Sequence, residues 1–269
     1  MYLQFIIVFV TTVILLLFGY KLSYAVKKKK LKIILGSIFF ALCLPGLSFL
    51  IMELPFFKKP IWFVEFRSIY RIELLTVFWG LLIGFITVKA DTAKVRWKLF
   101  NKYFYIIAVL LIIPPNMQCI GIPINYENLK SEWREEVCIQ SEGFTCAPSA
   151  IATVFRYFGQ EKTEAEVAKS VYTNPTGTSV YEIIRYIRKN GMKVECFYEK
   201  DLSKIPVPSI LDVNVSNIGH VIVYLGSDNG SYIIGDPLEG RVVLTKDEFQ
   251  KRYKFDGFVM SVENVNTLN

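Results

Sequence analysis

Histidine is the scarcest reactive residue in this chain: the 269 residues include a single one, His220. The five cysteines form no CxxC pair, show no spacing typical of a zinc site, and are odd in number. Neither a structural metal centre nor a disulfide framework is therefore expected. Any chemistry that needs an imidazole has to use this one ring.

Acidic residues are scarce in the first part of the chain. Residues 1–119 hold 15 Lys and Arg against 4 Asp and Glu, whereas residues 120–269 hold 16 against 20. The net charge of +7 is thus +11 on the first part and −4 on the second. With 52% hydrophobic residues and a mean hydropathy of +0.36, this predicts a membrane domain joined to a water-soluble one. Membrane loops explain the basic charge, so no nucleic-acid partner is expected.

Four uncharged apolar stretches stand out in the first part: 2–20, 33–52, 74–88 and 103–126. A membrane-spanning helix needs about 20 residues, so the third stretch is marginal. The sequence predicts an all-α region of four transmembrane helices over residues 1–118, with the lipid bilayer as its partner. No acidic residue lies inside a stretch, which argues against the alternative of a small transporter with an attached regulator.

The loops between these stretches predict an orientation. Loops one and three together hold eleven Lys and Arg, against four in the middle loop. The positive-inside rule then places loops one and three in the cytoplasm and residues 120–269 outside. Loss of the marginal third span would reverse the side of the C-terminal part.

Residues 119–137 are interpreted as a tether, followed by a domain over 138–265. Apolar positions at helical spacing predict a helix over 146–158, with Pro148 in its first turn, where a missing N–H costs nothing. Capping boxes predict two more helices. Short β-branched runs follow, beginning with residues 192–198. Helices first and strands afterwards predict an α+β domain with an antiparallel sheet.

One pair of strands is especially informative. Residues 220–226 and 231–236 flank an Asp-Asn-Gly turn, which predicts a β-hairpin. If Gly226 faces Gly230, then His220 faces Asp236, and directly opposed residues have Cβ atoms about 5 Å apart. The sequence therefore predicts an imidazole beside a carboxylate.

Cys146, placed at the start of the predicted helix, adds a candidate nucleophile. The helix dipole and a neighbouring imidazolium both favour a thiolate. His220 would act as general base and acid, and Asp236 would orient the ring. Gln140 and the backbone N–H of Cys146 would form an oxyanion hole. Taken singly, each residue has a structural explanation, such as a buried cysteine or a turn aspartate.

The stretch from Gln140 to about residue 262 resembles the bacteriocin-processing cysteine peptidases that cut double-glycine leaders and are papain-like. The resemblance rests on Gln140 six residues before Cys146, on YFG at 157–159, on HVIVYL at 220–225 and on DPLEG at 236–240. It covers the soluble part alone, and it implies a papain-like fold and a peptide or protein substrate. No metal or organic cofactor is implied.

Three departures from the family pattern matter. Ala147 stands where the family has glycine. The chain has no G-x-x-x-x-G-K-[ST] phosphate loop, so ATP-driven export would need a separate exporter as partner. Relatives fused to an exporter work in the cytosol, whereas loop charge here favours the outside, where Cys138 is close enough in sequence to pair with Cys146 in a disulfide.

The sequence thus predicts a membrane-anchored, papain-like cysteine peptidase with Cys146, His220, Asp236 and Gln140 as site residues. Two alternatives stay open. One is a non-catalytic, peptidase-like module that binds a leader peptide or a partner protein. The other is a related thiol amidase or acyltransferase with the same triad.

Overall fold

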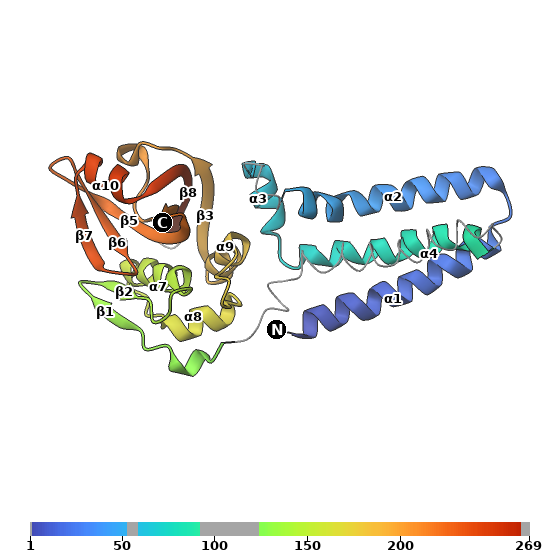
Figure 1. Ribbon diagram of the computed structural model, residues 1–269, viewed down its shortest axis with the longest axis horizontal. Coiled ribbons are helices and arrows are strands. Elements are labelled where there is room, and N and C mark those ends of the chain that lie inside the picture. The colour runs from blue at the N-terminus through green and yellow to red at the C-terminus, as the bar shows by residue number, and fades with distance from the viewer. Residues whose placement is uncertain (1, 53–58, 92–123, 265–269) are drawn as a thin grey trace. The chain divides into compact units, whose positions relative to one another are not determined.

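The computed structural model describes residues 2–52, 59–91 and 124–264 (Figure 1). These residues form two compact units. The apolar unit contains residues 2–52, 59 and 71–91, and the second unit contains residues 60–70 and 124–264. Each unit has its own core and is described by itself.

The apolar unit consists of α1 (Tyr2–Ala25), α2 (Lys29–Ile51), the 3-10 helix η1 (Ile72–Val77) and α4 (Phe78–Asp91). Two helical segments, Ile6–Ala25 and Lys29–Phe49, are long and apolar enough to cross a membrane. A third crossing is counted only if the bent pair Ile61–Arg67 and Ile72–Thr87, with 85° between its parts, is one span. The predicted count of four is thus not reached in the described part of the chain. The predicted fourth span, residues 103–126, lies outside the described residues except for its last three positions.

Small residues allow α1 and α4 to approach closely. A Cβ atom at Gly84 would lie 1.9 Å from the carbonyl oxygen of Leu16, and one at Gly80 would lie 2.3 Å from that of Thr12. Gly80 and Gly84 are four residues apart on α4, the spacing of a GxxxG packing motif. Glycine is therefore required at both positions for the two helices to pack at this distance.

The second unit is built on a six-stranded antiparallel sheet in the order β3-β8-β4-β5-β6-β7. Its strands are β3 (Met192–Tyr198), β4 (Ser209–Val215), β5 (Ile218–Asp228), β6 (Ser231–Asp236), β7 (Gly240–Leu244) and β8 (Lys254–Asn264). A separate two-stranded sheet pairs β1 (Glu132–Arg134) with β2 (Val137–Ile139). The predicted class, helices combined with an antiparallel sheet, is confirmed.

The helices of this unit are α3 (Ile61–Arg67), η3 (Tyr126–Asn128), α7 (Cys146–Tyr157), α8 (Glu164–Ser170), α9 (Val180–Lys189), η4 (Leu202–Lys204) and α10 (Lys246–Arg252). The prediction of a helix over 146–158 agrees with α7, which Phe158 caps. Thr163 caps α8 by accepting from the N–H of Glu166, as predicted. Ser179 caps α9 through Tyr181 instead of the expected third residue.

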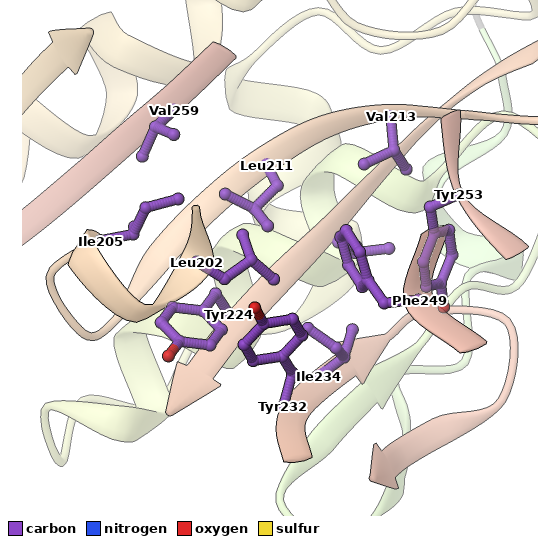
Figure 2. Close-up of a cluster of buried hydrophobic side chains, with 11 residues drawn as sticks. Leu202, Ile205, Leu211, Val213, Tyr224, Tyr232, Ile234, Phe249, Tyr253 and Val259 are labelled. Carbon is purple, nitrogen blue, oxygen red and sulfur yellow. The ribbon is translucent and has the colours of Figure 1, made fainter. Parts of the chain in front are cut away.

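Both faces of the sheet are covered. On one face, α10 and η4 enclose a cluster of buried apolar and aromatic side chains (Figure 2). Its members are Leu202, Ile205, Leu211, Val213, Ile222, Tyr224, Tyr232, Ile234, Phe249, Tyr253 and Val259. On the other face lies α7, and a Cβ atom at Gly235 of β6 would be 3.6 Å from Thr153 of α7. The sheet thereby fixes α7 and α10 on opposite sides of β5 and β6.

The segment that joins α2 to α4 belongs to the second unit. Its helix α3 contacts α9 through two arginines. The Arg188 guanidinium binds the Glu65 carboxylate at 2.8 and 3.0 Å. Arg185 donates to the carbonyl oxygens of Arg67 at 2.6 Å and Ile69 at 2.9 Å. Arg185 thus satisfies carbonyls that the end of a helix leaves without intrahelical donors.

The domain boundaries at 118, 137 and 265 stay predictions. Within the range interpreted as a tether, the structure has η3 and β1, and β2 begins at Val137. The sequence reading also missed α3, α10 and β8, although β8 lies inside the sheet between β3 and β4.

Candidate active site

Cys146 begins α7, and the turn before it is held by short polar contacts. Thr145 precedes the helix, and its hydroxyl accepts from the N–H of Glu142 at 3.1 Å. Pro148 lies in the first turn, where its missing N–H would have no intrahelical acceptor. The Cys146 thiol is free and partly exposed, whereas α7 from Ala147 to Phe155 is buried. A reagent can therefore reach the first residue of an otherwise buried helix.

A buried carboxylate holds the loop that leads to this helix. The backbone N–H of Ser141 donates to Glu164 Oε1 at 2.8 Å, and its hydroxyl donates to Oε2 at 2.5 Å. Glu164 is fully buried at the start of α8. This charged anchor fixes the chain next to Gln140, one of the predicted site residues.

Gln140 lies beside the end of β6, because its N–H donates to the carbonyl oxygen of Pro237 at 2.9 Å. Its side-chain Nε2 donates to the carbonyl oxygen of Glu142 at 2.8 Å. Its Oε1 is buried and accepts no hydrogen bond from the described residues. The amide thus faces the turn before α7, and its role as oxyanion donor stays a prediction.

The predicted hairpin exists, but its register differs from the prediction. The turn is Asn229-Gly230, both with positive φ (48° and 80°), the backbone of a type I′ turn. Asp228 pairs with Ser231, and Tyr224 pairs with Ile234 instead of the expected Tyr232, a shift of two residues. The direct opposition of His220 and Asp236 was therefore wrong.

A β-bulge brings the two residues to the same face nevertheless. The register shifts by one residue between Tyr224 and Gly226, and Gly226 has a φ of 130°, which favours glycine. Beyond the bulge, the pairing differs from the expected register by two residues. Because side chains alternate between faces with a period of two, His220 and Asp236 stay on one face of the sheet. They are diagonal neighbours, whose side chains can still reach one another.

The two side chains meet inside the protein. His220 Nε2 lies 2.8 Å from Asp236 Oδ1, and both side chains are buried. The backbone N–H of Leu238 donates to the same oxygen at 2.9 Å. The hydroxyl of Tyr253 donates to Asp236 Oδ2 at 2.5 Å, and Arg252 approaches that oxygen at 3.4 Å. Four groups thus compensate one buried charge, as a buried carboxylate requires.

Cys146 is close enough to the His220 ring to influence its pKa. Burial alone would lower the pKa of His220, but hydrogen bonds with Asp236 and Cys146 outweigh it and raise the pKa to about 9. The pKa of Asp236 is lowered: burial opposes its charge, but hydrogen bonds from His220, Tyr253 and Leu238 prevail. Because Nε2 faces Asp236, Nδ1 is the ring nitrogen left for the sulfur. The structure therefore brings Cys146, His220 and Asp236 together.

Cys138 does not pair with Cys146 in the structure. Both are free thiols. Cys138 is buried on β2, and burial raises its pKa to about 12. A thiol of that pKa stays protonated at neutral pH and is a poor nucleophile.

Three residues that shape the site were missed by sequence reasoning: Glu164, Arg252 and Tyr253. A usable signal existed for the last two, since Thr245 and Glu248 form a capping box that starts α10. No local pattern, however, predicts that the end of α10 reaches Asp236. That contact comes from the packing of α10 on the sheet.

The second unit is similar to known proteins. Residues 134–267 match the model of the peptidase C39 family. An uncharacterized protein of Methanothermobacter marburgensis is 32% identical over 137 residues, covering 51% of this chain and 94% of the relative. A probable functional amyloid protease, FapD, of Pseudomonas fluorescens is 25% identical over 120 residues, covering 41% of this chain and 53% of the relative.

A solved structure, the peptidase domain of Streptococcus ComA, a bi-functional ABC transporter, is 24% identical. The match covers 47% of this chain and 96% of the ComA peptidase-domain chain, with a TM-score of 0.42. The described site combines a thiol, an imidazole and a carboxylate at one end of an antiparallel sheet. The chain belongs to the peptidase C39 family, and the resemblance found in the sequence is confirmed at that level.

The titration of His220 can be followed without ambiguity, because it is the only histidine. In the full-length chain in detergent, with 15N-labelled histidine, we expect an NMR midpoint near pH 9, against about 6.5 for an unperturbed ring. Asp236→Asn should lower it, whereas Asp228→Asn, at the exposed end of the same hairpin, should not.

The sign for stability follows from the raised pKa. The charged ring contributes stability that is fully present below pH ~6.5, the unfolded value, and is lost as the pH rises through about 9. A wild-type midpoint at or below 6.5, or one that Asp236→Asn leaves unchanged, would contradict the hydrogen-bonded arrangement.

Proposed function

We propose that this chain is a membrane-anchored cysteine peptidase that hydrolyses a peptide or protein by a Cys146–His220–Asp236 triad. The observation that carries the proposal is the buried 2.8 Å contact between His220 Nε2 and Asp236 Oδ1, in a ring whose pKa Cys146 also raises. Membership of the peptidase C39 family supports it.

In the first step, the Cys146 thiolate attacks the scissile carbonyl carbon, and the carbonyl oxygen takes up the negative charge. The backbone N–H of Cys146 and the Gln140 amide would stabilise this oxyanion. Collapse breaks the C–N bond, and the His220 imidazolium gives its proton to the leaving amine. The product is a thioester on Cys146 with a neutral ring.

In the second step, the neutral His220 takes a proton from water, and the resulting hydroxide attacks the thioester. The carboxylic product leaves, and the thiolate and imidazolium are restored. Asp236 accepts from Nε2–H throughout, which keeps Nδ1 toward the sulfur and stabilises the charged ring. A groove for the substrate is not needed to define these roles.

The substrate that the family suggests is a leader peptide with a double glycine at the cleavage site. In that case a separate exporter would act with this chain, because the sequence has no phosphate loop of its own. The Streptococcus protein combines both parts, being described as a bi-functional ABC transporter. The Pseudomonas relative is instead named a probable functional amyloid protease. Leader peptides are therefore one of several candidate substrate classes.

The anchor in this proposal is the apolar unit. Its α1 and α2 have the length and hydropathy of membrane spans. Large apolar side chains such as Phe9, Ile14 and Leu17 remain more than half exposed on α1, where lipid would cover them.

Connectivity supports the extracytoplasmic side for the peptidase unit. Helix α3 joins α2 to α4, so it lies on one side of the membrane, and its contacts with Arg185 and Arg188 of α9 require α9 on that same side. The lysine-rich loop between α1 and α2 is favoured on the cytoplasmic side. One crossing by α2 then puts α3, and with it the peptidase unit, outside. This arrangement needs η1 and α4 to cross back without α3, and it needs one further crossing after α4, for which the sequence offers residues 103–126.

Cys146→Ala and His220→Ala should abolish hydrolysis while the protein still folds, because each removes a group that takes part in bond making. The expected loss of turnover on a fluorogenic Gly-Gly peptide is at least about 10⁴-fold. Cys196→Ala, which removes a buried thiol of β3, serves as the control and should keep activity.

A peptide with an electrophilic end separates the rival functions. A peptidase should form a covalent adduct at Cys146, and peptides that are hydrolysed faster should, in their electrophilic form, react with Cys146 faster. A binding module would hold the peptide equally well in Cys146→Ala and form no adduct in the wild type. Adduct formation without peptide hydrolysis would favour an amidase or acyltransferase. Hydrolysis that persists in either alanine variant sinks the proposed triad.

The orientation can be tested with single cysteines in a background in which all five native cysteines are replaced by serine. In intact cells, a membrane-impermeant maleimide should label Ser227→Cys in the hairpin and Tyr70→Cys after α3. It should not reach Lys28→Cys before α2 until the cells are opened. Labelling of the Lys28 variant alone would reverse the orientation. Opposite behaviour of the Ser227 and Tyr70 variants would rule out the shared side.

A further inference from the structure

Asp236 uses its two carboxylate oxygens for different partners. Oδ1 faces His220 and the N–H of Leu238, whereas Oδ2 receives the Tyr253 hydroxyl at 2.5 Å and Arg252 at 3.4 Å. The carboxylate is fully buried at the end of β6. The orientation of its plane therefore depends on which donors hold Oδ2, since rotation about its last torsion is otherwise soft.

Of the two donors, Tyr253 is the better placed. Arg252 is at the limit of hydrogen-bond distance, is partly exposed, and also forms an ion pair with Glu239. Tyr253 is 1% exposed, and its hydroxyl is at the short end of hydrogen-bond distances. Burial and its hydrogen bond to Asp236 raise the pKa of Tyr253, so the hydroxyl keeps the proton that it donates.

The position of the hydroxyl is fixed by packing. Tyr253 caps the end of α10, and its N–H donates to the carbonyl oxygen of Phe249 at 2.8 Å. The two rings lie side by side with centroids 5.2 Å apart (Figure 2). Phe249 in turn contacts Tyr232 of β6, with centroids 5.8 Å apart. The aromatic cluster thus ties the hydroxyl to the strand that ends at Asp236.

We propose that Tyr253 is a positioning residue of this site: its hydroxyl holds Oδ2 so that Oδ1 stays on His220 and Nδ1 stays toward Cys146. The expected effect of Tyr253 on catalysis rests on the proposed function. Its effect on the orientation of Asp236 and His220 does not. It also assigns a function to α10, a helix that supplies no residue to the predicted triad.

The test compares Tyr253→Phe with Tyr232→Phe in the full-length protein. Both variants delete one hydroxyl from the same aromatic cluster and keep the ring. Tyr253→Phe should lower kcat on the Gly-Gly peptide by about 10- to 100-fold, the range of a hydrogen bond to a charged group, with KM unchanged. Tyr232→Phe should stay within about twofold of the wild type.

A second readout does not depend on activity. The Nε2–H proton of His220 should give a slowly exchanging NMR signal in the wild type and in Tyr232→Phe, and it should exchange rapidly in Tyr253→Phe. Because the Tyr253 hydrogen bond lowers the pKa of Asp236, the acid pH at which this signal disappears should rise in the variant. A merely structural role would move neither.

The outcomes separate the two proposals. If the wild type does not hydrolyse peptides but the NMR signal changes as expected, the proposed function fails and the positioning role stands. If Tyr253→Phe leaves the His220 signal unchanged, or loses activity with that signal intact, the positioning role is overturned.

Discussion

One buried negative charge organises the candidate active site. Asp236 lies at the end of β6 with no exposure to solvent, and a lone carboxylate in that place would be strongly destabilising. Its compensation comes from the neighbouring strand through His220, from its own turn through Leu238, and from α10 through Tyr253. The hairpin, the turn and the helix must therefore all be in place before the imidazole has its orientation. The geometry of the candidate site and the packing of these elements therefore depend on the same contacts.

The candidate site residues could be picked out in the sequence because their signals are local. Small residues and a proline around Cys146 mark a helix start, and the Asn-Gly turn places His220 and Asp236 on adjacent strands. The register could not be read, because it depends on the bulge at Gly226. An isolated glycine in a strand is a sign of a bulge, but its position relative to the turn is set by the packing of Tyr224 and Ile234 in the core.

Other parts of the structure have no local signal. Tyr253 reaches Asp236 through the packing of α10 on the sheet, and α3 joins the second unit although it lies between two apolar stretches of the sequence. The contacts of Arg185 and Arg188 with α3 connect residues more than a hundred positions apart. Such contacts assign α3 to the second unit, whereas the count of charged residues in loops indicates only a side of the membrane.

The central claim is that the His220 ring activates Cys146. The most direct measurement is the alkylation rate of Cys146 from pH 4 to 10 in detergent-solubilised protein whose other cysteines are serine, with His220→Ala beside it. We predict that Cys146 is alkylated much faster in the wild type than in His220→Ala at neutral pH, because the ring takes up the proton of the thiol. Equal alkylation rates in the two proteins across this pH range would contradict the claim.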